Sequence, residues 1–320
     1  MNWKRISSAL TGAILAATVS AGAAAQDYPN QPIKFVVWSS AGSPLDTMMR
    51  QLGKQVSEVL GQDVPVENRT GGSGAVAMAY VKSQPADAHT VLSTTASMTF
   101  TMAKGNVPFT PDDFMMLRAV QAEPSAVAVR ADSPFENFED VVEQLKENPA
   151  ALKVGGYASA GFHQFVFYRL QQEGKFPAAW IPFDGGNEAA LALLGGHIDV
   201  AVMTPSSAQA QIDSGEIKLL GISTAERDEY FPDVPTFKEQ GYNVVESIWR
   251  GVMVASDTPQ DRVEVLLSAI DEVQSSQEWK DFMKANMQSS LSMSSEELQE
   301  QVRSEVDSRR RFLKENGYLN

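Results

Sequence analysis

Short apolar runs alternate with amphipathic stretches along most of the chain. An apolar run at residues 33–38 predicts a strand, and Met48, Leu52 and Val56 recur on one face of a helix predicted over residues 46–60. The same pattern predicts further strands at residues 64–67, 90–93, 153–156, 179–182, 200–203 and 217–223, and helices at residues 75–82, 162–173, 188–194 and 207–214. Alternation on this scale predicts an α/β protein whose parallel sheets are covered by helices on both faces.

The strands and helices form two series with no flexible linker between them, so we expect two lobes that share a hinge. Two extended apolar runs, Ala126–Arg130 and Ile248–Ala255, bracket the second series, and we interpret them as the strands that cross between lobes. Lobe one then comprises residues 26–126 and 251–320, and lobe two comprises residues 127–250. The tail from Pro259 to Glu315 is expected to be helical with a solvated, charged face. Ligands of such proteins bind between the lobes, at the C-terminal ends of strands.

The first 25 residues are expected to lie outside the fold. Lys4 and Arg5 precede a mildly apolar stretch from Ile6 to Val19, and small residues follow up to Ala25. This order is typical of a secretory signal peptide cleaved after Ala25. An N-terminal membrane anchor is the alternative, but the apolar stretch is shorter than the ~20 residues that a bilayer requires. We therefore expect an exported protein.

Composition and charge narrow the classes of function. The 320 residues include no Cys, which excludes disulfides, iron–sulfur clusters and thiol nucleophiles. The net charge of −14 disfavours binding to nucleic acid or to anionic lipid. The histidines, His89, His163 and His197, lie in separate segments without metal-ligand spacing, and no G-x-S-x-G elbow is present. We expect neither an enzyme nor a metal or cofactor site.

Two loops carry the candidate chemistry, and each lies between a predicted strand and a predicted helix. In the first loop, residues 39–43 precede Asp46, which forms a capping box with Ser43. In the second loop, residues 155–161 precede His163. Amides of small residues at the positive end of a helix bind anions, so two such loops predict a cleft for an acid with an anionic group at each end. An ordinary strand-to-helix turn is the alternative for the first loop.

Several motifs occur in a characteristic order along the mature chain. They are Tyr28-Pro29-x-x-Pro32, Glu67-Asn68-Arg69, Ile181-Pro182-Phe183-Asp184-Gly185-Gly186, Leu194-Gly195-Gly196-x-x-Asp199 and Trp249-x-Gly251. With these motifs the chain resembles the substrate-binding proteins of tripartite tricarboxylate transporters, the Bug receptors. The resemblance implies a two-lobed type II periplasmic binding protein. It also implies a small carboxylate ligand, which the protein would deliver to the membrane subunits of the transporter.

The resemblance implies which residues contact the ligand. Both loops would hold one carboxylate through backbone amides and ordered water, and residues 94–97 and 204–206 would complete the cleft wall. The expected ligand-binding residues are Ser39, Ser40, Ala41, Gly42, Ser43, Asp46, Thr94, Ser97, Tyr157, Ser159, Ala160, Gly161, His163, Asp184, Thr204 and Arg250. Trp38 and Ser43 replace the family's usual Pro and Gly, so the first loop is expected to bind differently from the usual form.

The roles of Arg250 and Trp38, and the choice between a transport receptor and two alternative functions, stay open at the level of sequence. Arg250 either supplies a cation for a second carboxylate or forms a surface salt bridge, and Trp38 either forms an aromatic wall of the cleft or is buried beneath the lobe. The protein is expected to be a monomeric periplasmic receptor without a nucleic-acid partner. A receptor that presents its ligand to a membrane sensor kinase is one alternative function. A hydrolase or transferase on the same fold is another.

Overall fold

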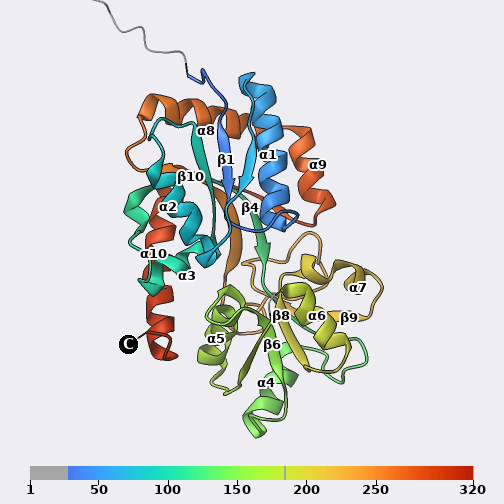
Figure 1. Ribbon diagram of the computed structural model, residues 1–320. Helices are drawn as coiled ribbons and strands as arrows, with labels where there is room; N and C mark the ends of the chain where they lie inside the picture. The colour runs from blue at the N-terminus through green and yellow to red at the C-terminus, as the bar shows by residue number, and fades with distance from the viewer. Residues whose placement is uncertain (1–27, 184, 320) are drawn as a thin grey trace, which may run out of the picture.

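The computed structural model describes residues 28–183 and 185–319, which form two α/β lobes (Figure 1). The first sheet has the strand order β11-β4-β10-β3-β1-β2, and the second has the order β7-β6-β8-β5-β9. The predicted signal peptide lies outside the described residues.

The first lobe contains a six-stranded sheet with helices on both sides (Figure 1). Its strands are β1 (Lys34–Val37), β2 (Val66–Asn68), β3 (Thr90–Thr95), β4 (Phe114–Pro124), β10 (Ser247–Ala255) and β11 (Ser289–Met293). Its helices are α1 (Pro44–Leu60), α2 (Ala75–Ser83), α3 (Ala96–Lys104), α8 (Gln260–Ser275), α9 (Gln277–Ala285) and α10 (Ser295–Glu315), with short 3-10 turns η1 (Gly72–Gly74) and η2 (Pro111–Asp113).

The second lobe contains a five-stranded sheet. Its strands are β5 (Ala126–Arg130), β6 (Val154–Tyr157), β7 (Trp180–Phe183), β8 (Val200–Met203) and β9 (Ile217–Ile222). Its helices are α4 (Phe138–Glu147), α5 (Phe162–Gly174), α6 (Gly186–Leu194) and α7 (Gln209–Asp213), with the 3-10 turn η3 (Pro205–Ala208) before α7.

The predicted strands and helices are confirmed, but the expectation of parallel sheets is confirmed only for part of each sheet, because both sheets are mixed. In the first sheet, β10 runs antiparallel to β3 and β4, and in the second sheet, β5 runs antiparallel to β8 and β9. Strands β5 and β10 each follow a strand of the other sheet with no helix between, so neither belongs to a strand–helix–strand unit that would make it parallel to its neighbours. The sequence patterns also missed β4, β11, α3 and α4, and β11 interrupts the tail that was expected to be helical throughout.

The chain passes between the sheets at two places. It leaves the first sheet at Ser125, between β4 and β5, and returns between β9 and β10. The expected lobe limits assigned Ala126 to lobe one and residues 247–250 to lobe two. Strand pairing instead places Ala126 in the second sheet and Ser247–Arg250 in the first.

Helix α10 packs against both lobes at one side of the molecule (Figure 1). Phe312 near its end lies edge-to-face against Phe100 of α3, with ring centroids 6.2 Å apart, and against Phe165 of α5, with centroids 5.4 Å apart. The predicted solvated face is present, but the helix also buries Arg309 between these aromatic rings and Glu246. The C-terminal helix therefore joins the cores of the two lobes.

Candidate functional site

A cavity of about 580 Å³ lies between the lobes and is lined by residues of both. Its walls are built where strands β1, β3, β6, β7 and β8 end and where helices α1, α3, α5 and α6 begin. The described lining residues are Trp38, Ser39, Ser40, Ser43, Pro44, Leu45, Thr95, Ser97, Tyr157, His163, Gly185, Gly186, Asn187, Thr204, Ser206, Ser207, Ile248 and Arg250. Because the N-terminal N–H groups of a helix have no partner within the helix, this arrangement directs hydrogen-bond donors and positive helix ends at one space.

The first loop divides its residues between the cavity and its own support. Ser39, Ser40 and Ser43 line the cavity, and the Ser39 and Ser43 hydroxyls lie 2.6 Å apart. Asp46 instead faces inward, where its carboxylate accepts a hydrogen bond from the Gly42 amide at 2.8 Å. Of the residues expected to touch the ligand here, Ala41, Gly42 and Asp46 do not line the cavity.

Asp46 is the centre of a hydrogen-bond network that shapes the first loop. Its carboxylate also accepts from the Asn68 amide at 2.8 Å and from Arg50 at 2.9 Å. Asn68 in turn donates to the Ser39 carbonyl at 3.0 Å. Burial raises the pKa of Asp46, but the hydrogen bonds from Arg50, Gly42 and Asn68 lower it by more than burial raises it. The pKa of Asp46 is therefore below its ordinary value. An ionised Asp46 therefore fixes the path of the loop.

The second loop has a left-handed backbone at two alanines. Ala158 and Ala160 have φ values of 61° and 53°, which are uncommon for residues with a side chain. Trp180 donates to the Ala158 carbonyl at 2.9 Å, and the Ala160 amide donates to Gln164 at 2.6 Å. These bonds hold the conformation from the side away from the cavity.

Only the two ends of the second loop line the cavity among its described residues. Tyr157 and His163 do so, whereas Ser159, Ala160 and Gly161 do not. The Ser159 hydroxyl lies 3.2 Å from the hydroxyl of Tyr318, beyond the end of α10. The middle of the loop therefore faces the C-terminal segment.

His163 is a buried neutral residue in the cavity wall. The residue is 5% exposed, and its Nδ1 lies 2.9 Å from the Ser125 hydroxyl at the point where the chain changes sheets. Burial, with a smaller contribution from the nearby Arg250 guanidinium, lowers the pKa of His163 to about 3. At neutral pH the imidazole can donate or accept a hydrogen bond but carries no charge.

Arg250 lines the cavity and forms a buried ion pair with Glu123. The two side chains are 7% and 1% exposed, so the alternative of a surface salt bridge is wrong. Glu123 also accepts hydrogen bonds from Gln288 at 2.7 Å and from the Ser206 hydroxyl of lobe two at 2.5 Å. This network connects the lobes directly behind the cavity wall.

The remaining expected residues fall into three groups. Ser97 and Thr204 line the cavity, Thr94 does not although its neighbour Thr95 does, and Asp184 lies outside the described residues. Trp38 lines the cavity while packing against the cores below it. Sequence reasoning missed Gly185, Gly186, Asn187, Ser207 and Ile248. The Gly-Gly pair at the start of α6 comes soon after the end of β7, and a strand end of this kind is the signal that identified the other two loops.

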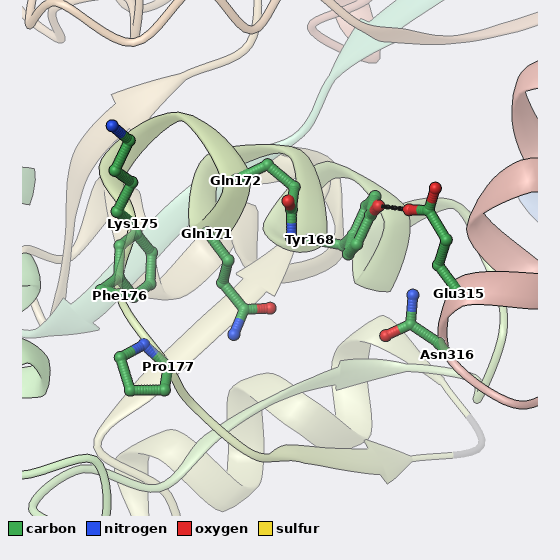
Figure 2. Close-up of a pocket in the computed structure, with 8 residues that line it drawn as sticks. All are labelled: Tyr168, Gln171, Gln172, Lys175, Phe176, Pro177, Glu315 and Asn316. Atoms are coloured by element: carbon green, nitrogen blue, oxygen red, sulfur yellow. Dashed lines mark hydrogen bonds between the residues drawn. The ribbon is translucent and has the colours of Figure 1, made fainter.

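A second cavity, of about 450 Å³, lies where α5 meets the end of α10. Figure 2 shows its lining, in which the Tyr168 hydroxyl faces the Glu315 carboxylate and donates a hydrogen bond to it. Burial and the Glu315 carboxylate raise the pKa of Tyr168 to about 12. Because these residues hold α10 against α5, we interpret this cavity as a by-product of helix packing.

Within residues 28–183 and 185–319, no cluster of three or more His, Cys, Asp or Glu side chains is arranged to hold a metal ion. None of the helices in that part of the chain has the length and apolar character needed to cross a bilayer.

Two α/β lobes around a cavity are the architecture of a solute-binding protein, and comparison with known proteins bears this out. A family model for the tripartite tricarboxylate transporter family receptor, TctC, matches residues 48–318. The chain belongs to this family, which confirms the prediction from the sequence motifs. The family is one of solute-binding receptors.

Individual relatives agree with this assignment. A UPF0065 protein of Agrobacterium vitis, from the TAR-I ttuE-ttuC' intergenic region, is 30% identical over 274 residues, 84% of this chain and 78% of that protein. The structure of a TctC solute binding protein from Polaromonas, without ligand, matches at a TM-score of 0.80 and 26% identity, covering 90% of this chain and 99% of that one. An R. palustris protein solved with adipate matches in fold, at a TM-score of 0.78 and 21% identity over 91% of this chain and 99% of its own. These matches confirm the predicted two-lobed α/β fold.

Proposed function

We propose that the protein is a monomeric periplasmic receptor that binds a small carboxylate in the cavity between its lobes. The ligand class comprises dicarboxylates, tricarboxylates and related organic acids, and the partners are the membrane subunits of a tripartite tricarboxylate transporter. The observation that supports this function best is the convergence of the N-termini of α1, α3, α5 and α6 on one cavity. Adipate in the R. palustris relative is an acid of the same class.

Hydrogen bonds from the cavity wall are sufficient for useful affinity. Charge-assisted hydrogen bonds contribute about 1.5–3 kcal/mol each, so four or five of them give roughly 6–15 kcal/mol before desolvation is subtracted. A micromolar dissociation constant requires about 8 kcal/mol. The acidic surface does not oppose this, because surface charge is screened over about 8 Å at physiological ionic strength while the wall donors act at contact.

A thermal-shift screen of the chain from residue 26 tests the proposal. The panel contains C4 to C6 di- and tricarboxylates, acidic amino acids, and benzoate- and phthalate-type acids. A ligand at 100 times its dissociation constant stabilises the folded state by about 2.7 kcal/mol, which raises the Tm by several degrees. A shift with one class of acid supports the function. No shift with any acid, for protein freed of retained ligand by unfolding and refolding, contradicts it.

Two capping serines provide a matched pair of variants for the same screen. Ser43 caps α1 and lines the cavity, whereas Ser294 caps α10 and does not. Ser43→Ala and Ser294→Ala should each cost about 1 kcal/mol of stability, because each removes an N-cap acceptor. Only Ser43→Ala should also reduce the ligand-induced shift. An equal reduction in both variants would show that the shift does not report on this cavity.

A further inference from the structure

The C-terminal segment of the chain holds the second loop from outside the cavity. The hydroxyl of Tyr318 lies 3.2 Å from the Ser159 hydroxyl and accepts a hydrogen bond from the Gln164 side chain at 3.0 Å. The same Gln164 side chain accepts a hydrogen bond from the Ala160 amide at 2.6 Å. Tyr318 is therefore connected to two residues in the middle of the loop, to Ser159 directly and to Ala160 through Gln164.

The way in which α10 ends fixes the position of Tyr318. Gly317 has a left-handed φ of 73°, and its amide donates to the Lys314 carbonyl at 3.1 Å. The Tyr318 amide donates to the Leu313 carbonyl at 2.8 Å. These two bonds form a Schellman motif, which satisfies carbonyl groups of the last helical turn. The Tyr318 ring also lies near the Phe312 ring, with centroids 6.3 Å apart, so both backbone bonds and packing place this tyrosine.

The helix that carries Tyr318 belongs to the first lobe. The Ser295 hydroxyl at its start donates to the Leu117 carbonyl of β4 at 2.8 Å, and the Gln299 side chain donates to the Pro111 carbonyl at 2.9 Å. The far end of α10 lies beside α5 of the second lobe (Figure 1). Tyr318 therefore reaches the second loop from the opposite lobe, and it is not among the described residues that line the cavity.

The second loop needs this support because its backbone is strained. Ala158 and Ala160 are left-handed, a conformation that residues with a side chain keep only where their surroundings enforce it. Helix α5 follows directly, and its N-cap residue, Gly161, has no side chain that could cap it. The first amides of α5 are among the donors that we assign to a bound carboxylate. A relaxed loop would change the path of the chain between Tyr157 and His163, both of which line the cavity.

We propose that Tyr318 is a positioning residue for the candidate ligand site, because its hydroxyl holds the second loop in the shape that binds a carboxylate. It acts through Gln164 and Ser159 rather than by contact with the ligand. The proposal rests on the carboxylate-receptor function and adds to it a residue at the C-terminus of the chain, outside the cavity.

Three substitutions at the contact between α10 and the second lobe separate positioning of the loop from packing of the helix. Tyr318→Phe removes the hydroxyl and keeps the aromatic ring. Tyr168→Phe is the matched control, because the hydroxyl that it removes bonds to Glu315 at the end of α10 rather than to the loop. Gln164→Met removes the side chain through which Tyr318 acts and keeps a similar length.

Hydrogen exchange of the Ala158 and Ala160 amides, measured without any added acid, tests the support of the loop. Both amides are hydrogen-bonded, the first to the Phe183 carbonyl and the second to Gln164. Tyr318→Phe should make these amides exchange at least threefold faster, whereas Tyr168→Phe should change their exchange by less than twofold. In Gln164→Met the exchange should already be fast, so adding Tyr318→Phe should change it by less than twofold.

Titration calorimetry measures the consequence for binding. The probes are succinate, citrate, adipate, glutamate and phthalate, which represent the groups of acids in the thermal-shift panel. For each acid that binds wild-type protein, Tyr318→Phe should weaken the affinity at least threefold, and Tyr168→Phe should leave it within twofold. Gln164→Met should weaken the affinity at least as much as Tyr318→Phe, with no additional loss in the double variant.

The possible results separate this proposal from the function on which it rests. If an acid binds wild-type protein and Tyr318→Phe leaves its affinity within twofold, the positioning role is wrong while the receptor function stands. The role is also wrong if Tyr168→Phe has the same effect as Tyr318→Phe, because the hydroxyl would then act only through the packing of α10. If none of the acids binds wild-type protein, the receptor function is wrong, and the exchange data alone decide whether Tyr318 holds the loop.

Discussion

Protonation of one buried side chain, His163, should contribute to the destabilisation of this protein at acidic pH. His163 lies in the cavity wall beside Ser125, where the chain passes between the two sheets, and the residue is 5% exposed. Burial, with a contribution from Arg250, lowers the pKa of His163 to about 3, compared with about 6.5 in an unfolded chain. The folded protein therefore excludes a proton that the unfolded chain accepts.

The sign and size of the effect follow from proton linkage. Between pH 6.5 and pH 3 the unfolded chain binds more protons at this position than the folded protein, so the free energy of unfolding decreases as the pH is lowered. Above pH 6.5 the His163 side chain is neutral in both the folded and the unfolded state, so it no longer changes the free energy of unfolding with pH. One pH unit corresponds to about 1.4 kcal/mol. Between pH 7 and pH 4, His163 should therefore lower the free energy of unfolding by about 3 kcal/mol.

Carboxylates also titrate in this range, so the measurement must be a difference between variants. His163→Gln keeps a polar partner for Ser125 and removes the titration, and His197→Gln removes an exposed histidine as the control. Urea unfolding of all three proteins at pH 7 and pH 4 gives the free energies. Wild-type protein and His197→Gln should each lose about 3 kcal/mol more than His163→Gln. Equal losses in all three proteins would refute the assignment of a neutral, buried His163.

Two further substitutions test the support of the site and of the sheet. Asp46→Asn would place an NH₂ group against the Gly42 amide or the Arg50 guanidinium, and it should cost about 1–3 kcal/mol in urea unfolding while weakening ligand binding through the first loop. Gly251→Ala would place a Cβ 2.1 Å from the Arg118 carbonyl oxygen of the neighbouring strand, so it should cost about 1–3 kcal/mol or more, seen as a lower urea midpoint at unchanged slope.

Helices and strands could be predicted where their own residues show a pattern of apolar and polar positions. Strand β8, for example, is a short apolar run between a helix and a loop, and its limits follow from the sequence alone. Strand β4 was missed because it lies between β10 and β11 in the sheet and is buried on both faces, so its eleven residues show no alternation. Strand β11, with three serines in five residues, exists only through its pairing with β4.

No local sequence pattern predicts the ion pair between Glu123 and Arg250. Glu123 and Arg250 are separated by 127 positions and lie on different strands, β4 and β10. Their contact follows from the antiparallel pairing of β4 with β10, which places Arg250 opposite Gln121. Since the sequence predicted parallel sheets, it provided no reason to bring these two side chains together.

The loops after β1 and β6 show why a candidate binding motif is easier to recognise in a sequence than the residues that line the cavity. In each loop, small and polar residues follow a strand and precede a helix, which was sufficient to locate the cavity. Within each loop, however, some polar side chains must form hydrogen bonds with the backbone of the turn itself. Asp46 does this in the first loop, and Gln164 does it for the second by accepting from the Ala160 amide. Which residues remain free for a ligand depends on partners such as Asn68 and Tyr318, which lie far away in the sequence.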